Sequence, residues 1–225
     1  MTVRVPLLVF ARPPVPGRAK TRLAPLLGMH EAAALHRAFV ADTLATCGGA
    51  DGFEVRLSCA DDVEHPALVE LAAHADIERV VQAAGDLGAR MSAALASAVS
   101  ERGAGLVVGS DAPTLPVELL LQARDALLRS SGALVVIAPS ADGGYVLIGA
   151  GGTAPRLRGV RWSTPHALED TLVSVRSEGI PVVLLPPWYD VDTPADLRLL
   201  RMHLRLSSAI APESRRALSL RDAGG

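Results

Sequence analysis

Residues 3–23, VRVPLLVFARPPVPGRAKTRL, join an apolar stretch to a loop rich in proline and positive charge. The stretch from residue 3 to residue 11 predicts a buried β-strand, because most of its side chains are β-branched or large and apolar. Prolines stiffen the loop that follows, and Gly17 lets its backbone approach a ligand closely. Ligands of open α/β sheets bind at the carboxyl ends of the strands, so we expect this loop at a binding site.

Four cationic side chains belong to this loop, namely Arg12, Arg18, Lys20 and Arg22. Guanidinium and ammonium groups donate hydrogen bonds to phosphate oxygens, so the expected ligand is a polyanion. The loop lacks the Gly-Lys-Ser/Thr ending of a Walker A sequence. A basic surface loop that serves only solubility is the plain alternative, but it leaves the stiffening prolines and the position after the first strand unexplained.

Apolar runs and helical patterns alternate along the chain. This alternation predicts a single-domain, three-layer α/β/α sandwich over residues 1–206, with a mixed, mostly parallel sheet. The expected strands cover residues 3–11, 55–59, 77–82, 105–109, 133–139, 145–149 and 181–185. Helices are expected over residues 31–46 and 87–100, and three more are expected to begin at Pro116, Ser163 and Thr193.

Two local patterns refine this outline. Residues 140–144 are too few for a helical crossover, so the strands on either side of them are expected to run antiparallel. After residue 206 the sequence turns to Ser, Ala and Arg and ends in Gly-Gly. We therefore expect a loosely held C-terminal tail over residues 207–225.

The composition excludes several classes of protein. The 225 residues fit one domain, and an apolar fraction of 49% suffices for its core. A net charge of -2 without a Lys/Arg-rich run, and an aromatic fraction of 3%, argue against a nucleic-acid partner. No stretch suits a membrane span or a signal peptide, and two cysteines fit a reducing interior, so we expect a cytoplasmic protein with no membrane partner. Exposed sheet edges can pair between subunits, which allows a homodimer.

Carboxylates follow two of the expected strands. Asp111 comes directly after the strand 105–109, where it can hold a divalent cation against phosphate oxygens, although it also suits a turn. Asp190 and Asp192 follow the last strand, and side chains two apart in an extended segment point the same way. Either can supply the second metal-binding carboxylate, and Asp192 can instead cap the helix that Pro194 begins.

Two glycine-containing segments are candidates for nucleotide contact. In Gly85-Asp86-Leu87-Gly88-Ala89-Arg90 the amides of a helix start can meet an anion or a base edge, and Asp86 suits a plain N-cap equally well. Asp142, Gly143 and Gly144 permit close ligand approach and are also good turn residues. The six histidines show no metal spacing and no partner for nucleophilic catalysis, so we assign them no chemistry.

Together these motifs resemble the bacterial DUF2064 family of glycosyltransferase-A-like proteins. The resemblance rests on residues 11–23, 85–91, 109–111, 142–145, 162–164 and 189–197, which follow in family order over nearly the whole chain. It implies the GT-A fold of nucleotide-diphospho-sugar transferases. The wider superfamily includes sugar transferases that use nucleotide sugars, and nucleotidyltransferases similar to the molybdenum-cofactor guanylyltransferase and the phospholactate guanylyltransferase of deazaflavin-cofactor synthesis.

The resemblance also implies roles for single residues. Arg12, Lys20 and Arg22 match by position and type the loop that holds the triphosphate in the nucleotidyltransferases. Asp111 and Asp192 look like the two carboxylates that hold the metal. We therefore predict a nucleotidyltransferase that uses Mg²⁺ or Mn²⁺ to move a nucleoside monophosphate from a nucleoside triphosphate to a small phosphorylated or acidic acceptor. Pyrophosphate leaves, stabilised by the loop cations, and an anionic acceptor needs no general base.

The chain departs from the family pattern at one place. Many relatives carry Cys-Pro-Asp where residues 112–114 are Ala-Pro-Thr, so a carboxylate is lost there. The Asp-x-Asp of sugar transferases is also absent at Asp111, which favours nucleotidyl transfer. Two alternatives stay open. One is a glycosyltransferase with a nucleotide-sugar donor and Asp142 or Asp190 near the acceptor hydroxyl, and the other is a nucleotide-binding protein without catalysis.

Overall fold

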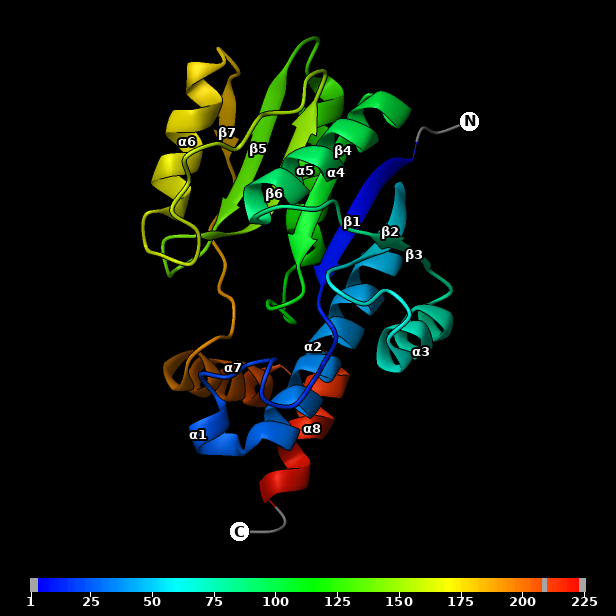
Figure 1. Ribbon diagram of the computed structural model, residues 1–225, viewed down its shortest axis with the longest axis vertical. Helices are drawn as coiled ribbons and strands as arrows, with labels where there is room; N and C mark the ends of the chain where they lie inside the picture. The colour runs from blue at the N-terminus through cyan, green and yellow to red at the C-terminus, as the bar shows by residue number, and fades with distance from the viewer. Residues whose placement is uncertain (1–3, 208–209, 223–225) are drawn as a thin grey trace.

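A computed structural model describes residues 4–207 and 210–222. Its sheet has seven strands in the order β3-β2-β1-β4-β6-β5-β7 (Figure 1). The strands are β1 (Val5–Ala11), β2 (Phe53–Cys59), β3 (Glu78–Val81), β4 (Ala104–Gly109), β5 (Leu134–Pro139), β6 (Tyr145–Gly151) and β7 (Val182–Leu184). All seven predicted strands are confirmed, with small differences at their ends, and the predicted start of the first at residue 3 lies outside the described residues.

One strand runs against the others. β6 is antiparallel to both of its neighbours, β4 and β5, whereas the remaining pairs are parallel. The short turn over residues 140–144 joins β5 to β6 directly, which confirms the predicted antiparallel pair. Because of this reversal, Tyr145 at the start of β6 lies at the same edge of the sheet as the carboxyl ends of β1 and β4.

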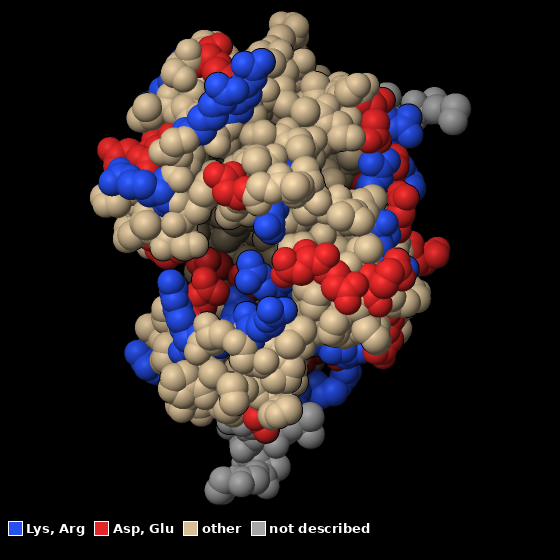
Figure 2. All heavy atoms as spheres, viewed as in Figure 1, with Lys and Arg blue, Asp and Glu red and all other residues tan. Residues whose placement is uncertain are grey.

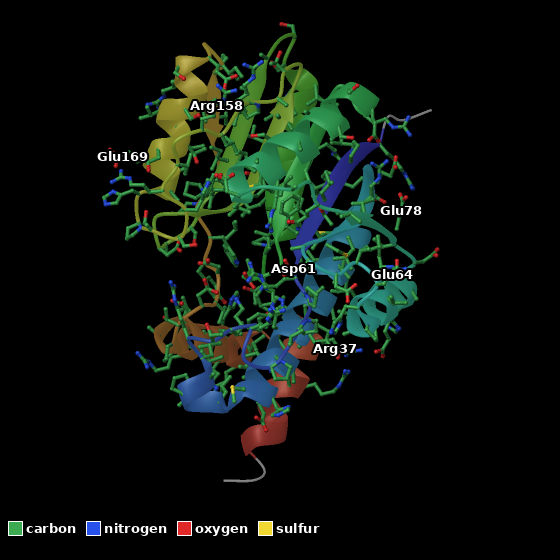
Figure 3. All side chains as sticks on the ribbon, viewed as in Figure 1. Arg37, Asp61, Glu64, Glu78, Arg158 and Glu169 are labelled. Atoms are coloured by element: carbon green, nitrogen blue, oxygen red, sulfur yellow. The ribbon has the colours of Figure 1, made fainter. Side chains whose placement is uncertain are left out.

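Helices cover both faces of the sheet and complete three layers. One face is covered by α2 (Met29–Gly48), α3 (Pro66–Ala75) and α5 (Val117–Arg129), and the other by α4 (Leu87–Arg102) and α6 (Ala167–Ser177). Side chains alternate along a strand, so Leu7 and Val9 of β1 enter the first core and Leu8 enters the second. On the first face, Arg37 of α2 (labelled in Figure 3) pairs with Glu70 of α3 at 2.9 Å.

A third buried cluster lies beyond the carboxyl edge of the sheet. Here α1 (Ala24–Leu27), α7 (Pro194–Leu206) and α8 (Pro212–Asp222) pack against the first half of α2, through side chains such as Phe39 and Leu200. We call this group of four helical segments the helical layer; Figure 1 shows it below the sheet. The second half of α2 packs on the sheet through residues such as Leu44. Helix α2 therefore belongs to two bodies, the sheet with its covering helices and the helical layer.

Helix α8 corrects the expectation of a loosely held tail. The carboxylate of Asp42, on α2, accepts hydrogen bonds from the backbone N–H groups of Glu213 and Ser214, at 2.9 and 2.8 Å, and from the Ser214 hydroxyl at 2.5 Å. A side chain far away in the sequence therefore caps this helix. Residues 208–209 and 223–225 of the expected tail lie outside the described residues.

The helix starts at Pro116 and Thr193 are confirmed, since Pro116 is the N-cap of α5 and Thr193 forms a capping box at the start of α7. The start expected at Ser163 is wrong, because the hydroxyl of Thr164 donates to the carbonyl of Arg161 and forms a turn, and α6 begins later. Helices α1 and α3 were not predicted. Among the described residues, no helix is long and apolar enough to cross a membrane.

Candidate functional site

A cleft of about 550 Å³ opens at the carboxyl edge of the sheet. Figure 2 shows it as a hollow between the sheet and the helical layer, with cationic and acidic side chains at its rim. The loop after β2 contributes Ala60 to its wall and carries Asp61 (Figure 3). The predicted site residues that line the cleft are Arg12, Arg18, Lys20, Arg22, Arg90, Asp111, Asp142, Gly144, Asp190 and Asp192.

Three predicted residues at the start of α4, namely Gly85, Asp86 and Gly88, are not among the described residues that line the cleft. The carboxylate of Asp86 accepts the N–H of Ala89 at 2.8 Å, which fits its reading as a plain N-cap. Gly85 precedes it in the left-handed region, with φ of 112°. A Cβ at Gly88 would lie 2.9 Å from the ring of Trp162, so Gly88 allows that ring to pack on α4. A direct nucleotide contact by these three residues stays a prediction.

The hairpin turn between β5 and β6 holds three more predicted residues, of which two line the cleft. Asp142 Oδ1 accepts the N–H of Gly144 at 2.9 Å, which is the predicted turn chemistry, and both residues line the cleft. Gly143, with φ of 89°, does not appear among the described lining residues. A Cβ there would lie 2.2 Å from the carbonyl oxygen of Pro165, so Gly143 permits the turn to pack against the segment before α6.

Lys20 joins the two predicted metal-binding carboxylates. Its Nζ lies 2.6 Å from Asp111 Oδ1 and 2.7 Å from Asp192 Oδ1, and its side chain is only 4% exposed. The ammonium also lies 5.4 Å from the centre of the Phe39 ring. Burial alone lowers the pKa of Lys20, but the charges of Asp111 and Asp192 outweigh it and raise that pKa above its usual value.

Backbone contacts bring these carboxylates together. The N–H of Val191 donates to the carbonyl of Asp111 at 2.9 Å, which fixes the segment before α7 against the end of β4. The capping box of Thr193 and Asp196 then begins α7, and the N–H of Asp192 donates to the Asp196 carboxylate. The Asp192 side chain is thereby left for the cleft rather than for capping.

Thr114 stands where the family resemblance led us to expect an aspartate, and it has a structural role. Its hydroxyl donates to the Tyr189 hydroxyl at 3.0 Å and accepts the indole N–H of Trp188 at 3.3 Å. Tyr189 in turn lies 2.8 Å from Nδ1 of His203 on α7. This chain of hydrogen bonds holds the segment that carries Asp190 and Asp192. The departure at residue 114 therefore supports the site instead of removing part of it.

Asp190 is a second carboxylate in the same segment. It accepts a hydrogen bond from the Ser140 hydroxyl at 2.7 Å, and it lines the cleft. Burial, with smaller contributions from the charges of Asp142 and Asp192, raises the pKa of Asp190 to about 6. Asp190 therefore binds a proton more readily than an ordinary aspartate.

His36, for which no role was predicted, lies beside Asp111. The imidazole is 3% exposed, its Nε2 lies 3.1 Å from the carbonyl oxygen of Arg12, and its Nδ1 lies 3.5 Å from Asp111 Oδ1. A carbonyl only accepts, so Nε2 carries a proton. Burial alone would raise the pKa of Asp111, but Lys20 and His36 hold it well below its usual range. No spacing rule marks this histidine, because it is one polar position within the long helix α2.

Aromatic and amide side chains complete the wall. Trp162 and Tyr145 meet edge to face with ring centres 6.3 Å apart, and both line the cleft together with Gln82. Trp162 belongs to the family motif at residues 162–164, and no role was predicted for it. Its position beside α4 is set by the contact with Gly88, which depends on the fold.

The donor set fits a divalent cation that is shared with phosphate. Two carboxylates, Asp111 and Asp192, already surround one positive group, the Lys20 ammonium. Within the described residues, no group of three His, Cys, Asp or Glu side chains could hold a metal ion. Mg²⁺ is commonly bound by one or two carboxylates while substrate phosphates and water fill the remaining positions.

Comparison with known proteins shows the family to which the chain belongs. A profile of the DUF2064 family, described as an uncharacterized protein conserved in bacteria, matches residues 43–164. A provisionally named nucleotide-diphospho-sugar transferase from Desulfovibrio desulfuricans G20 is 30% identical with a TM-score of 0.84, covering 97% of this chain and 95% of that chain. None of the curated proteins matches the chain.

Two more distant structures share the fold. A cytidylyltransferase from Leptospira borgpetersenii serovar Hardjo-bovis (strain JB197) is 15% identical with a TM-score of 0.61, covering 98% of this chain and 96% of that chain. A CMP:2-keto-3-deoxy-manno-octonic acid synthetase complexed with CTP is 14% identical with a TM-score of 0.53, covering 90% of this chain and 99% of that chain. At these identities the likeness concerns the fold alone.

Proposed function

The chain belongs to the DUF2064 family, and on that basis and the geometry of the cleft we propose that it is a metal-dependent nucleotidyltransferase. It moves a nucleoside monophosphate from a nucleoside triphosphate to a small phosphorylated or acidic acceptor. The observation that carries this proposal is one cleft in which a loop with four cations faces the carboxylates Asp111 and Asp192. Cations suit the triphosphate, and paired carboxylates suit a divalent metal.

The loop residues bind and orient the donor. Arg12, Arg18 and Arg22 line the cleft and donate to phosphate oxygens, which places the α-phosphorus near the acceptor. An acceptor oxygen forms a bond to the α-phosphorus, the bond to the bridging oxygen breaks, and pyrophosphate leaves with both electrons. Asp111 and Asp192 would hold Mg²⁺ or Mn²⁺, which neutralises phosphate charge when bound.

A second function is favoured by the carboxylates outside this pair. Asp142 and Asp190 line the same cleft as Trp162. A carboxylate beside an aromatic wall suits a hydroxylated acceptor, as in a glycosyltransferase with a nucleotide-sugar donor. Pyrophosphate distinguishes the two reactions, because only transfer from a triphosphate releases it.

Thermal unfolding against a panel of ligands tests the proposal. ATP, GTP, CTP, UTP, UDP-glucose and GDP-mannose are each added with and without Mg²⁺ or Mn²⁺. A triphosphate present at about 100 times its Kd stabilises the folded state by about 2.7 kcal/mol. We expect one triphosphate to raise Tm most, and only with metal. A nucleotide sugar that raises Tm more would favour the second function, and a flat panel would contradict both.

Matched variants then separate binding from catalysis. D111N removes one carboxylate of the cleft, whereas D51N makes the same change on an exposed turn before β2, at the opposite edge of the sheet. The metal-dependent rise in Tm is expected to disappear in D111N and to persist in D51N. With the preferred triphosphate and a panel of phosphorylated acceptors, pyrophosphate release is expected from D51N and not from D111N. Binding without any turnover would instead support a non-catalytic nucleotide-binding protein.

A further inference from the structure

We propose that the Lys20 ammonium holds the cation position between Asp111 and Asp192 in the nucleotide-free protein, so that the divalent metal enters only as a metal–nucleotide complex. The inference rests on the proposed metal-dependent function and deepens it, because it names the form of the donor that the cleft accepts. It also gives Lys20 two successive partners, first the carboxylates and then the phosphates.

The first argument is that the lysine and a metal compete for the same oxygens. Lys20 Nζ lies 2.6 and 2.7 Å from one oxygen of Asp111 and one of Asp192. Mg²⁺ binds carboxylate oxygens at about 2.0–2.1 Å. A divalent ion on these oxygens would therefore lie within a few ångströms of the ammonium, and the two cations repel each other strongly at that separation. The position can hold either cation but not both.

The second argument is that the ammonium is a strong competitor. It is tethered to the chain, its side chain is 4% exposed, and it lies within 2.7 Å of an oxygen of each carboxylate. With Lys20 in place, its charge cancels one of the two carboxylate charges, so the attraction for a free metal ion is reduced. Two carboxylates also leave most of the coordination positions of Mg²⁺ to water. Free metal thus gains little by displacing the lysine.

The third argument is that a nucleotide offers the lysine a new partner. Arg18 and Arg22 come from the same loop as Lys20, and all three line the cleft. A triphosphate bound there brings oxygens within the reach of a flexible four-carbon side chain. Lys20 has a left-handed backbone, with φ of 48°, and the N–H of Leu23 donates to its carbonyl. The loop therefore holds the lysine backbone while the side chain turns from carboxylate to phosphate.

Binding of Mn²⁺ alone tests the exchange without any turnover. Free Mn²⁺ is measured by electron paramagnetic resonance during titration of nucleotide-free wild type, K20M, K20Q and R22M. K20M and K20Q remove the ammonium, and R22M removes a loop cation for which the structure gives no contact with Asp111 or Asp192. We expect K20M and K20Q to bind Mn²⁺ at least tenfold more tightly than wild type. R22M is expected to match wild type, and the double variant K20M/D111N to lose the gain.

A non-hydrolysable analogue of the preferred triphosphate completes the test. Its addition is expected to tighten Mn²⁺ binding to wild type at least tenfold and to change K20M much less. Wild type that binds Mn²⁺ alone as tightly as K20M and K20Q would overturn the inference, and so would an equal gain in R22M. Failure of the proposed function would be seen in a different measurement, because no triphosphate would then yield pyrophosphate. Using K20Q beside K20M keeps the comparison decisive if one of the two variants does not fold.

Discussion

Replacement of Asp42 by alanine tests how α8 is held, and we expect it to lower the free energy of unfolding by about 2–4 kcal/mol. The N–H and the hydroxyl of Ser214, a fully buried residue, would lose their acceptor. Each buried donor left without a partner costs about 1–3 kcal/mol, so two cost about 2–6 kcal/mol. Burial raises the pKa of Asp42, which means that its carboxylate is itself destabilised in the fold, and its removal offsets part of this loss.

The assay is thermal and urea unfolding followed by circular dichroism. In a chain of this size the expected loss lowers Tm by roughly 4–16 °C. S214A removes only the hydroxyl and should cost about 1 kcal/mol, whereas D42N keeps one acceptor oxygen and should fall between S214A and D42A. A D42A protein within about 0.5 kcal/mol of wild type, which is the range of ordinary surface substitutions, would refute the docking of α8 on α2.

Three further substitutions test the cleft. T114V removes the hydroxyl that bridges two aromatic side chains, so it is expected to cost about 1–2 kcal/mol in urea unfolding and to reduce the Tm gain on nucleotide binding; unchanged values of both contradict the bridging role. Because the pKa of Asp190 is raised to about 6, the folded state holds that proton more tightly than the unfolded chain does, and the contribution of Asp190 to the unfolding free energy is expected to slope downward as pH rises from about 4 to about 6. D190N should flatten this slope in urea titrations at several pH values, and an equal slope in D190N would assign the effect to other groups. H36Q can still donate to the Arg12 carbonyl whereas H36F cannot, so calorimetric nucleotide affinity should stay near wild type in H36Q and fall about tenfold in H36F, the equivalent of one hydrogen bond; equal losses would contradict the positioning role.

Part of the site could be predicted from the sequence, because ligand-binding residues follow the carboxyl ends of parallel strands. Asp111, Asp192 and the loop cations follow apolar runs, and parallel strands bring their carboxyl ends to one edge. The reversal of β6 was also predictable, because the turn before it is too short for a crossover. These inferences use only local pattern and general topology, which a single sequence contains.

The features that were missed depend on contacts between distant segments. His36 reaches Asp111 from the middle of α2, and nothing in its neighbours distinguishes it from an ordinary helix position. Helix α8 is capped by Asp42, whereas sequence rules for caps look only at adjacent residues. Thr114 looked like a lost carboxylate, and only its hydrogen bonds to Trp188 and Tyr189 identify it as a support.

The two cores at the sheet and the one in the helical layer have a mechanical consequence for the cleft between them. Asp111 extends from the sheet, whereas Asp192 directly precedes α7 of the helical layer. The Lys20 ammonium therefore links two side chains that come from different cores, in addition to α2, which packs in both. Trp188 lies on the segment that joins β7 to α7, so its fluorescence would report any movement of that segment relative to the sheet.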